Sequence, residues 1–145
     1  MDTSQRASPS SEASNGILSA ISNEMVRIYK ENFGRGPTKT RTQWAGPDII
    51  VVTLEQTLTP AERKLVDMGE QGRLRDLRLL FQYAEVASFC DPIERLTGRK
   101  VRAFISGIDA KADLASEMFV LHAPGYEGDS RAELQRRVEL ARNGR

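Results

Sequence analysis

Residues Tyr29–Glu62, YKENFGRGPTKTRTQWAGPDIIVVTLEQTLTPAE, carry the clearest structural signals of the chain. Gly34 is placed to end a preceding helix in the left-handed conformation, and Gly36-Pro37 then forms a rigid corner. Two β-prone segments follow, residues 38–44 and 48–54, with a Gly-Pro turn between them. The stretch therefore predicts a helix, a β-hairpin and the start of a second helix, in that order.

The second helix has a clear start. The Thr59 side chain can accept a hydrogen bond from the exposed backbone amides, Pro60 has no amide proton to lose, and Glu62 completes a capping box. This helix is short and ends near Met68-Gly69. Gly98 is expected to end the helical region that follows.

Toward the N-terminal side of this stretch, apolar residues recur at three- and four-residue steps from about Gly16 to Phe33. This spacing predicts an amphipathic helix, with Asn15 as its cap. Residues 1–14 are rich in serine and poor in apolar side chains, so we expect them to form a disordered leader.

Downstream, the pattern predicts one long helix from about Gln71 to Leu96, with a kink or a restart at Asp91-Pro92. Its arginines alternate with acidic residues, which favours a solvated, salt-bridged face. The arginines assigned to this face are Arg73, Arg75, Arg78 and Arg95. The predicted core contacts are Leu74, Leu77, Leu80, Phe81, Ala84, Ile93 and Leu96.

Two further strands are expected at residues 99–106 and 117–122, joined by the polar segment 107–116, and residues 130–143 read as a weak, charged helix. The order is α-β-β-α-α-β-β-(α). Each hairpin has only one strongly apolar side, so helices on one face are the economical packing. The predicted fold class is α/β (α+β), with two layers and a four-stranded, largely antiparallel sheet built from two hairpins. The folded domain spans residues 15–123, and residues 124–145 form a charged C-terminal extension.

Composition limits the function classes. The net charge is +1, which argues against a protein built around nucleic acid or an anionic membrane surface. The longest apolar run, Ile49–Val52, is far too short to insert into a bilayer. The single Cys90 excludes an intrachain disulfide and fits a reducing cytoplasm. We expect a cytoplasmic protein that reaches a membrane only through a partner.

The best candidate binding site is the corner after the first helix. Its glycines expose backbone amides, and nearby cations could hold an anion such as phosphate or bicarbonate. The residues are Gly34, Arg35, Gly36, Pro37, Lys39 and Arg41, with Lys30 beside them. The favoured alternative is a helix end followed by a stiff turn, with Lys39 and Arg41 on an ordinary solvated strand edge.

No catalytic or metal-binding constellation is evident. Asp109, Asp113 and Glu117 are spaced like a loose acidic loop but lack a calcium-loop pattern, so a surface hairpin loop is favoured. Cys90 is expected to be a buried thiol, because the only histidine, His122, belongs to a distant element. We therefore expect no enzyme activity, no cofactor and no metal site.

Several short motifs resemble one family of small bacterial proteins, the MpsC family. The similarity covers about residues 17–121. It is carried by Arg27-Ile28-Tyr29, Phe33–Pro37, Val52-Thr53-Leu54, Leu58–Glu62 and Leu96–Val101. The positions that match the family pattern are Gly34, Arg35, Gly36, Pro37, Thr59, Pro60 and Gly98. The resemblance brings no catalytic residues with it.

The family is named for a sodium-translocating system that generates membrane potential. The resemblance implies a soluble accessory or regulatory protein, linked to a membrane cation or inorganic-carbon transport system whose transporting subunits are other proteins. The expected partners are those subunits, and an exposed strand edge favours a homodimer. The alternative function is a domain that senses a small anion or a nucleotide through the Gly34–Pro37 corner.

Overall fold

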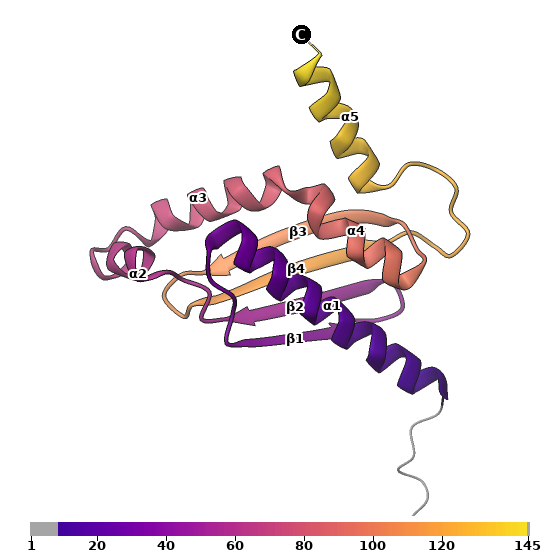
Figure 1. The fold of residues 1–145 in the computed structure, drawn as a ribbon, viewed down its shortest axis with the longest axis horizontal. Coiled ribbons are helices and arrows are strands. Elements are labelled where there is room, and N and C mark those ends of the chain that lie inside the picture. Colours follow the sequence, from indigo (N-terminus) through magenta and orange to yellow (C-terminus); the bar gives the residue numbers. More distant parts are fainter. Residues whose placement is uncertain (1–8, 145) are drawn as a thin grey trace, which may run out of the picture.

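The computed structural model describes residues 9–144, which form five helices and four strands (Figure 1). The first half of the chain contains α1 (Pro9–Phe33), β1 (Lys39–Trp44), β2 (Ile49–Glu55), α2 (Pro60–Asp67) and α3 (Gln71–Ala84). The second half contains α4 (Val86–Thr97), β3 (Val101–Asp109), β4 (Leu114–Leu121) and α5 (Arg131–Asn143). The predicted order of elements is confirmed, except that the long helix predicted before the second hairpin is divided into α3 and α4.

The strands form one antiparallel sheet in the order β1-β2-β4-β3. The two hairpins lie side by side because β2 pairs with β4, with Ile50 opposite Phe119 and Leu54 opposite Ala115. Ile50, Val52 and Leu54 alternate with half-buried residues along β2, as expected for a strand with one face in the core. The predicted sheet of two hairpins is confirmed.

In Figure 1, α1 and α4 cross one face of this sheet, while α3 runs beside β3. Their inner side chains form a single core with the sheet, in which the rings of Phe89, Phe104 and Phe119 lie next to one another. α5 packs its first turn on the body through the buried Ala132 and then projects away from it. The protein therefore has a helical layer on one face of the sheet.

The ends of two regions differ from the sequence expectation. α1 begins at Pro9, so residues 9–14 of the expected disordered leader are helical, while residues 1–8 lie outside the described part of the chain. A helix that is already held by packing extends at little cost, and Pro9 is tolerated because it is the first helical residue. The strands of the second hairpin are also longer than predicted, so a turn at residues 110–113 replaces most of the expected polar segment.

The predicted single long helix is wrong. The chain turns at Glu85, and Asp91-Pro92 lies inside α4 rather than at a helix start. A straight helix over both segments would be about 40 Å long, whereas a nine-residue strand such as β3 is about 30 Å long. The turn at Glu85 lets both helices stay in contact with β3.

Among residues 9–144, no helix is long and apolar enough to cross a membrane.

Candidate functional site

The predicted anion-binding corner follows the end of α1. Gly34 has a φ of +74°, and its amide donates to the carbonyl oxygen of Lys30 at 2.9 Å, so it acts as the helix C-cap. Gly36 passes close to α1, where an added Cβ would lie 3.4 Å from the Val26 side chain. Gly34 therefore has a conformational reason to be glycine, whereas a Cβ at Gly36 would make only an ordinary contact.

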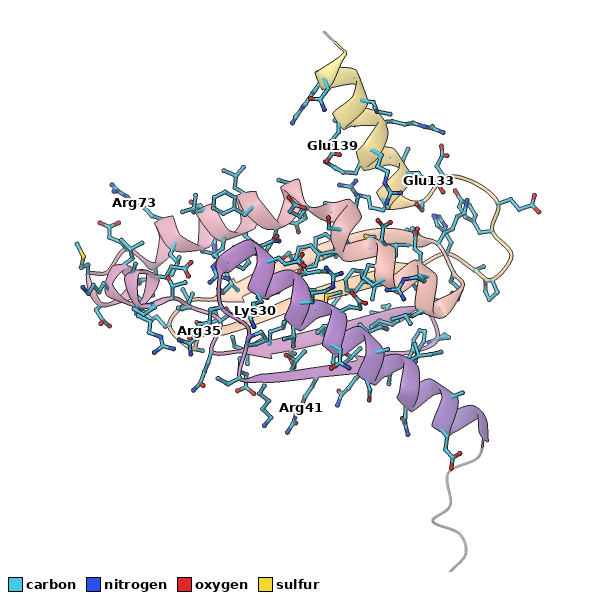
Figure 2. All side chains as sticks on the ribbon, in the orientation of Figure 1. Lys30, Arg35, Arg41, Arg73, Glu133 and Glu139 are labelled. Atoms are coloured by element: carbon cyan, nitrogen blue, oxygen red, sulfur yellow. The ribbon has the colours of Figure 1, made fainter. Side chains whose placement is uncertain are left out.

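The cations around this corner do not converge. Lys39 Nζ lies 3.9 Å from Glu55 Oε2, and Figure 2 shows Arg41 extending from β1 away from Lys30. Arg35 is half-buried and forms no hydrogen bond or ion pair with any described residue. The anion site stays a prediction. Lys30 and Arg41 also form no ion pair with a described residue, but both are exposed, so Arg35 is the half-buried cation of this set.

The predicted caps occupy helix ends. Thr59 Oγ1 accepts from the Glu62 amide at 3.3 Å, and Glu62 Oε1 accepts from the Thr59 amide at 2.9 Å, with Pro60 as the first helical residue of α2. Gly98 follows α4 with a φ of +70°. Thr59, Pro60 and Glu62 therefore begin α2, and Gly98 ends α4.

Glu62 also holds a buried arginine that the sequence analysis places wrongly. Arg78 was expected on a solvated face, yet it is 1% exposed. Its Nε and Nη2 atoms donate to the two carboxylate oxygens of Glu62 at 2.6 Å each, and Nη2 also donates to the carbonyl oxygen of Thr57 at 2.9 Å. Its guanidinium lies 3.7 Å above the ring centroid of Phe33. Arg78 thereby ties α3 to α1, to the start of α2 and to the segment after β2.

Burial acts to raise the pKa of Glu62. The hydrogen bonds from Arg78 and from the Thr59 amide outweigh that effect, so the pKa of Glu62 is lowered overall. The carboxylate therefore remains ionised opposite Arg78.

A second buried polar cluster joins α1, α3 and β4. The Tyr29 hydroxyl donates to Glu117 Oε1 at 2.7 Å, while Gln82 Nε2 donates both to the Tyr29 oxygen, at 2.8 Å, and to Glu117 Oε1. Glu117 is fully buried, so it does not lie on the surface loop that the sequence predicted. Burial raises its pKa to about 7, against the opposing effect of the hydrogen bonds from Tyr29 and Gln82.

This cluster also contains buried polar atoms without a hydrogen-bond partner among the described residues. They are Glu117 Oε2, Gln82 Oε1 and Ser106 Oγ. A protonated Glu117 is a donor as well as an acceptor, so a proton on Oε2 reduces the cost of burying these groups. The arrangement can hold one exchangeable proton in the core near neutral pH.

Sequence reasoning missed this cluster, although two signals pointed to it. Glu117 alternates with Ala115 and Phe119, so it shares their face of the strand. Arg78 and Gln82 follow Leu74 at four-residue steps, on the helix stripe that faces the core. The apolar residues of α3 drew the prediction to a neighbouring stripe instead.

That neighbouring stripe is largely exposed. Leu80 is 66% exposed, and Leu77, Phe81 and Ala84 are also exposed, which overturns their assignment to the core. α5 adds exposed apolar side chains of its own, and a groove between the two helices is lined by Leu80, Tyr83 and Arg142 among others. We call this region the α3–α5 surface. It consists of Leu77, Leu80, Phe81, Tyr83, Leu134 and Val138.

Comparison with protein families gives a match over most of the chain. Residues 14–123 match the family described as "Na+-translocating membrane potential-generating system (MpsC)". The chain belongs to the MpsC family. No curated protein and no solved structure matches it.

The MpsC match runs from α1 through β4 and ends before α5. It therefore includes both buried polar clusters, the Gly34–Pro37 corner and the exposed stripe of α3. The α5 half of the α3–α5 surface lies beyond the MpsC region. Among residues 9–144, no group of three or more His, Cys, Asp or Glu side chains is placed to hold a metal ion.

Proposed function

We propose that this MpsC-family protein is a non-catalytic accessory or regulatory protein that binds a transport subunit of a Na+-translocating membrane system. The family description supports the link to such a system. The single observation that carries the binding role is the exposed apolar α3–α5 surface. It supports a protein partner that covers this surface in the assembled system.

α3 buries polar side chains and exposes apolar ones. The helix buries Arg78 and Gln82 but exposes Leu77, Leu80 and Phe81. Because these three large apolar side chains are exposed, the fold lacks the free energy of burying them, on the order of 1.5–3 kcal/mol each. Groups of exposed large apolar side chains mark interaction sites on soluble proteins.

The shape and charge of the surface favour an amphipathic helix as the binding element of the partner. α3 and α5 enclose a groove, and apolar grooves between helices accept the apolar face of a third helix. On α5, Leu134, Val138 and Arg142 follow one another at four-residue steps and so share one side. We expect an acidic residue of the partner helix to meet Arg142 at the rim.

The test is binding of the tagged full-length protein to purified subunits of the cation-translocating system, reconstituted in lipid nanodiscs. Leu80→Lys places a charge in the groove, and Val138→Lys places one on the exposed α5 side of the α3–α5 surface. Each is expected to weaken binding by at least about tenfold, the effect of losing an apolar contact at the centre of an interface. The measurement is the dissociation constant from biolayer interferometry.

Met68→Lys is the matched control, because Met68 is 72% exposed but lies after α2, away from the groove. Binding that both Leu80→Lys and Val138→Lys retain, or that Met68→Lys removes equally, would contradict the assigned surface. Failure of the wild-type protein to bind any of the reconstituted subunits would overturn the proposed function itself.

The small-anion sensor remains a second candidate because of one observation, the half-buried Arg35 without a partner among residues 9–144. If an anion binds there, millimolar phosphate or bicarbonate raises the melting temperature, since a ligand of the native state stabilises it by about 2.7 kcal/mol at a hundredfold excess over Kd. Arg35→Ala is expected to remove the shift. Arg73→Ala, at an exposed position of α3, is expected to keep it. The same melting temperature with and without both anions would dismiss this candidate.

A further inference from the structure

The sheet has a second face, turned away from the helices, that is rich in apolar side chains. Residues paired across the strands share a face, so the register identifies this one. One row across it contains Gln43, Val51, Met118 and Ile105, and the next contains Ile49, Val120 and Ala103. We call these two rows the apolar half of the open face.

No described helix or loop covers this half. Ile105 is 52% exposed, and Met118, Val51 and Val120 are half-buried. An added Cβ at Gly107, also on this face, would meet nothing within 4 Å. An apolar sheet face of this kind is normally packed against another layer about 10 Å away.

The other half of the open face is polar, and its charges are arranged by strand. The end row contains Lys39 on β1, Glu55 on β2, Leu114 on β4 and Asp109 on β3. The β1 edge also presents Arg41 in the adjacent row. On the open face, the β1 edge is therefore basic, and the β3 edge is acidic in the same end row.

From this pattern we infer that the protein forms a homodimer in which two copies stack their open faces about a twofold axis parallel to the strands. This axis places β2 of one copy over β4 of the other, so Val51 and Met118 meet at the centre. It also places the β1 edge over the β3 edge, so Lys39 of each copy lies opposite Asp109 of the other. An aligned stack of two sheets is the packing found in β-sandwiches.

The charge pattern decides between the two possible in-plane axes. A twofold axis perpendicular to the strands would place the charged end row over Ile49, Val120 and Ala103, burying charges against apolar side chains without partners. The parallel axis leaves the apolar half of each copy facing the apolar half of the other. With the parallel axis, a second copy therefore packs against the apolar half and places opposite charges against the polar half.

The open face of the sheet, which this dimer buries, differs from the exposed strand edge that the sequence analysis predicted as the dimer interface. It also differs from the α3–α5 surface, so the dimer and the proposed partner use separate faces.

The first experiment is analytical ultracentrifugation of the full-length protein over a micromolar concentration series. The wild-type protein is expected to sediment as a dimer. Met118→Lys places a charge at the centre of the interface and is expected to raise the dimer dissociation constant by at least about a hundredfold, as the loss of a central interface contact does. Ile105→Lys, at an exposed position on β3, is a second variant with the same expected direction.

Met68→Lys makes the same chemical change outside both surfaces and is expected to leave the dimer intact. Circular dichroism confirms that each variant is folded. A monomeric wild-type protein throughout the series overturns the proposal, and so does a dimer that survives both Met118→Lys and Ile105→Lys.

The second experiment tests the axis. Lys39→Glu brings like charges together across the interface and is expected to weaken the dimer by roughly tenfold, since the twofold repeats the change at two sites. Adding Asp109→Lys restores the opposite-charge pairs and is expected to recover most of the loss. Additive weakening by the two substitutions would contradict the parallel axis.

Discussion

Replacing Arg78 with alanine is expected to lower the free energy of unfolding by about 3–5 kcal/mol, the usual effect of removing one partner from a buried ion pair. The substitution leaves the Glu62 carboxylate and the Thr57 carbonyl without their donor, and it removes the guanidinium from the ring of Phe33. It also leaves a cavity between α3 and α1. Urea unfolding, followed by circular dichroism, measures the loss.

Arg75→Ala is the matched control on the same helix, because the Arg75 side chain is exposed and its nearest acidic group, Asp76, lies 4.0 Å away. We expect this control to change stability by less than about 0.5 kcal/mol. Arg78→Lys keeps the charge but cannot form the forked contact with Glu62, so its stability is expected to fall between those of the wild type and Arg78→Ala. An Arg78→Ala protein as stable as Arg75→Ala would show that the buried pair makes no net contribution.

Replacing Glu117 with glutamine is expected to make the protein more stable than the wild type at pH 8, by about 3 kcal/mol, and to have little effect near pH 4.5. The reason is the raised pKa of about 7, compared with an ordinary value of 4.5. Between these values the native state holds a proton that the unfolded chain has released, so the unfolding free energy of the wild type falls as pH rises. Each pKa unit corresponds to about 1.4 kcal/mol, which sets the size of the effect.

Glutamine suits this position because its oxygen can still accept from the Tyr29 hydroxyl and its amide can donate to the unpaired acceptors nearby. The measurement is urea unfolding of both proteins at several pH values from 4.5 to 8. Glu31→Gln, at an exposed position of α1, serves as the control, with no growing difference expected. A difference between Glu117→Gln and wild type that stays constant across the series would rule out titration of Glu117 in this window.

The backbone plan of the protein follows from local signals in the sequence. Gly34 and Gly98 end helices because glycine adopts positive φ without strain. Thr59 and Glu62 start α2 through a capping box that spans four residues. Alternation along residues 49–55 determines which side of β2 faces the core. Each of these signals acts within one turn or one strand, so no knowledge of distant residues is needed to interpret it.

The candidate site was much less predictable. The stripe of α3 that faces the core carries Arg78 and Gln82, and these side chains are acceptable there only because Glu62, Tyr29 and Glu117 arrive from other elements to pair with them. From the sequence alone, a stripe of leucines is the better core face, because burying a polar group without a partner is costly. The partner of Gln82 on β4 lies 35 residues away.

The order of helices and strands, their caps and the alternation of the strands depend on neighbours within a few residues, so the sequence predicts them. The fold as a whole is needed to establish which polar groups are buried together, which leucines of α3 remain exposed and which face of the sheet is left open. Those outcomes depend on long-range pairing, above all that of β2 with β4, which brings the elements close enough for their polar side chains to satisfy one another.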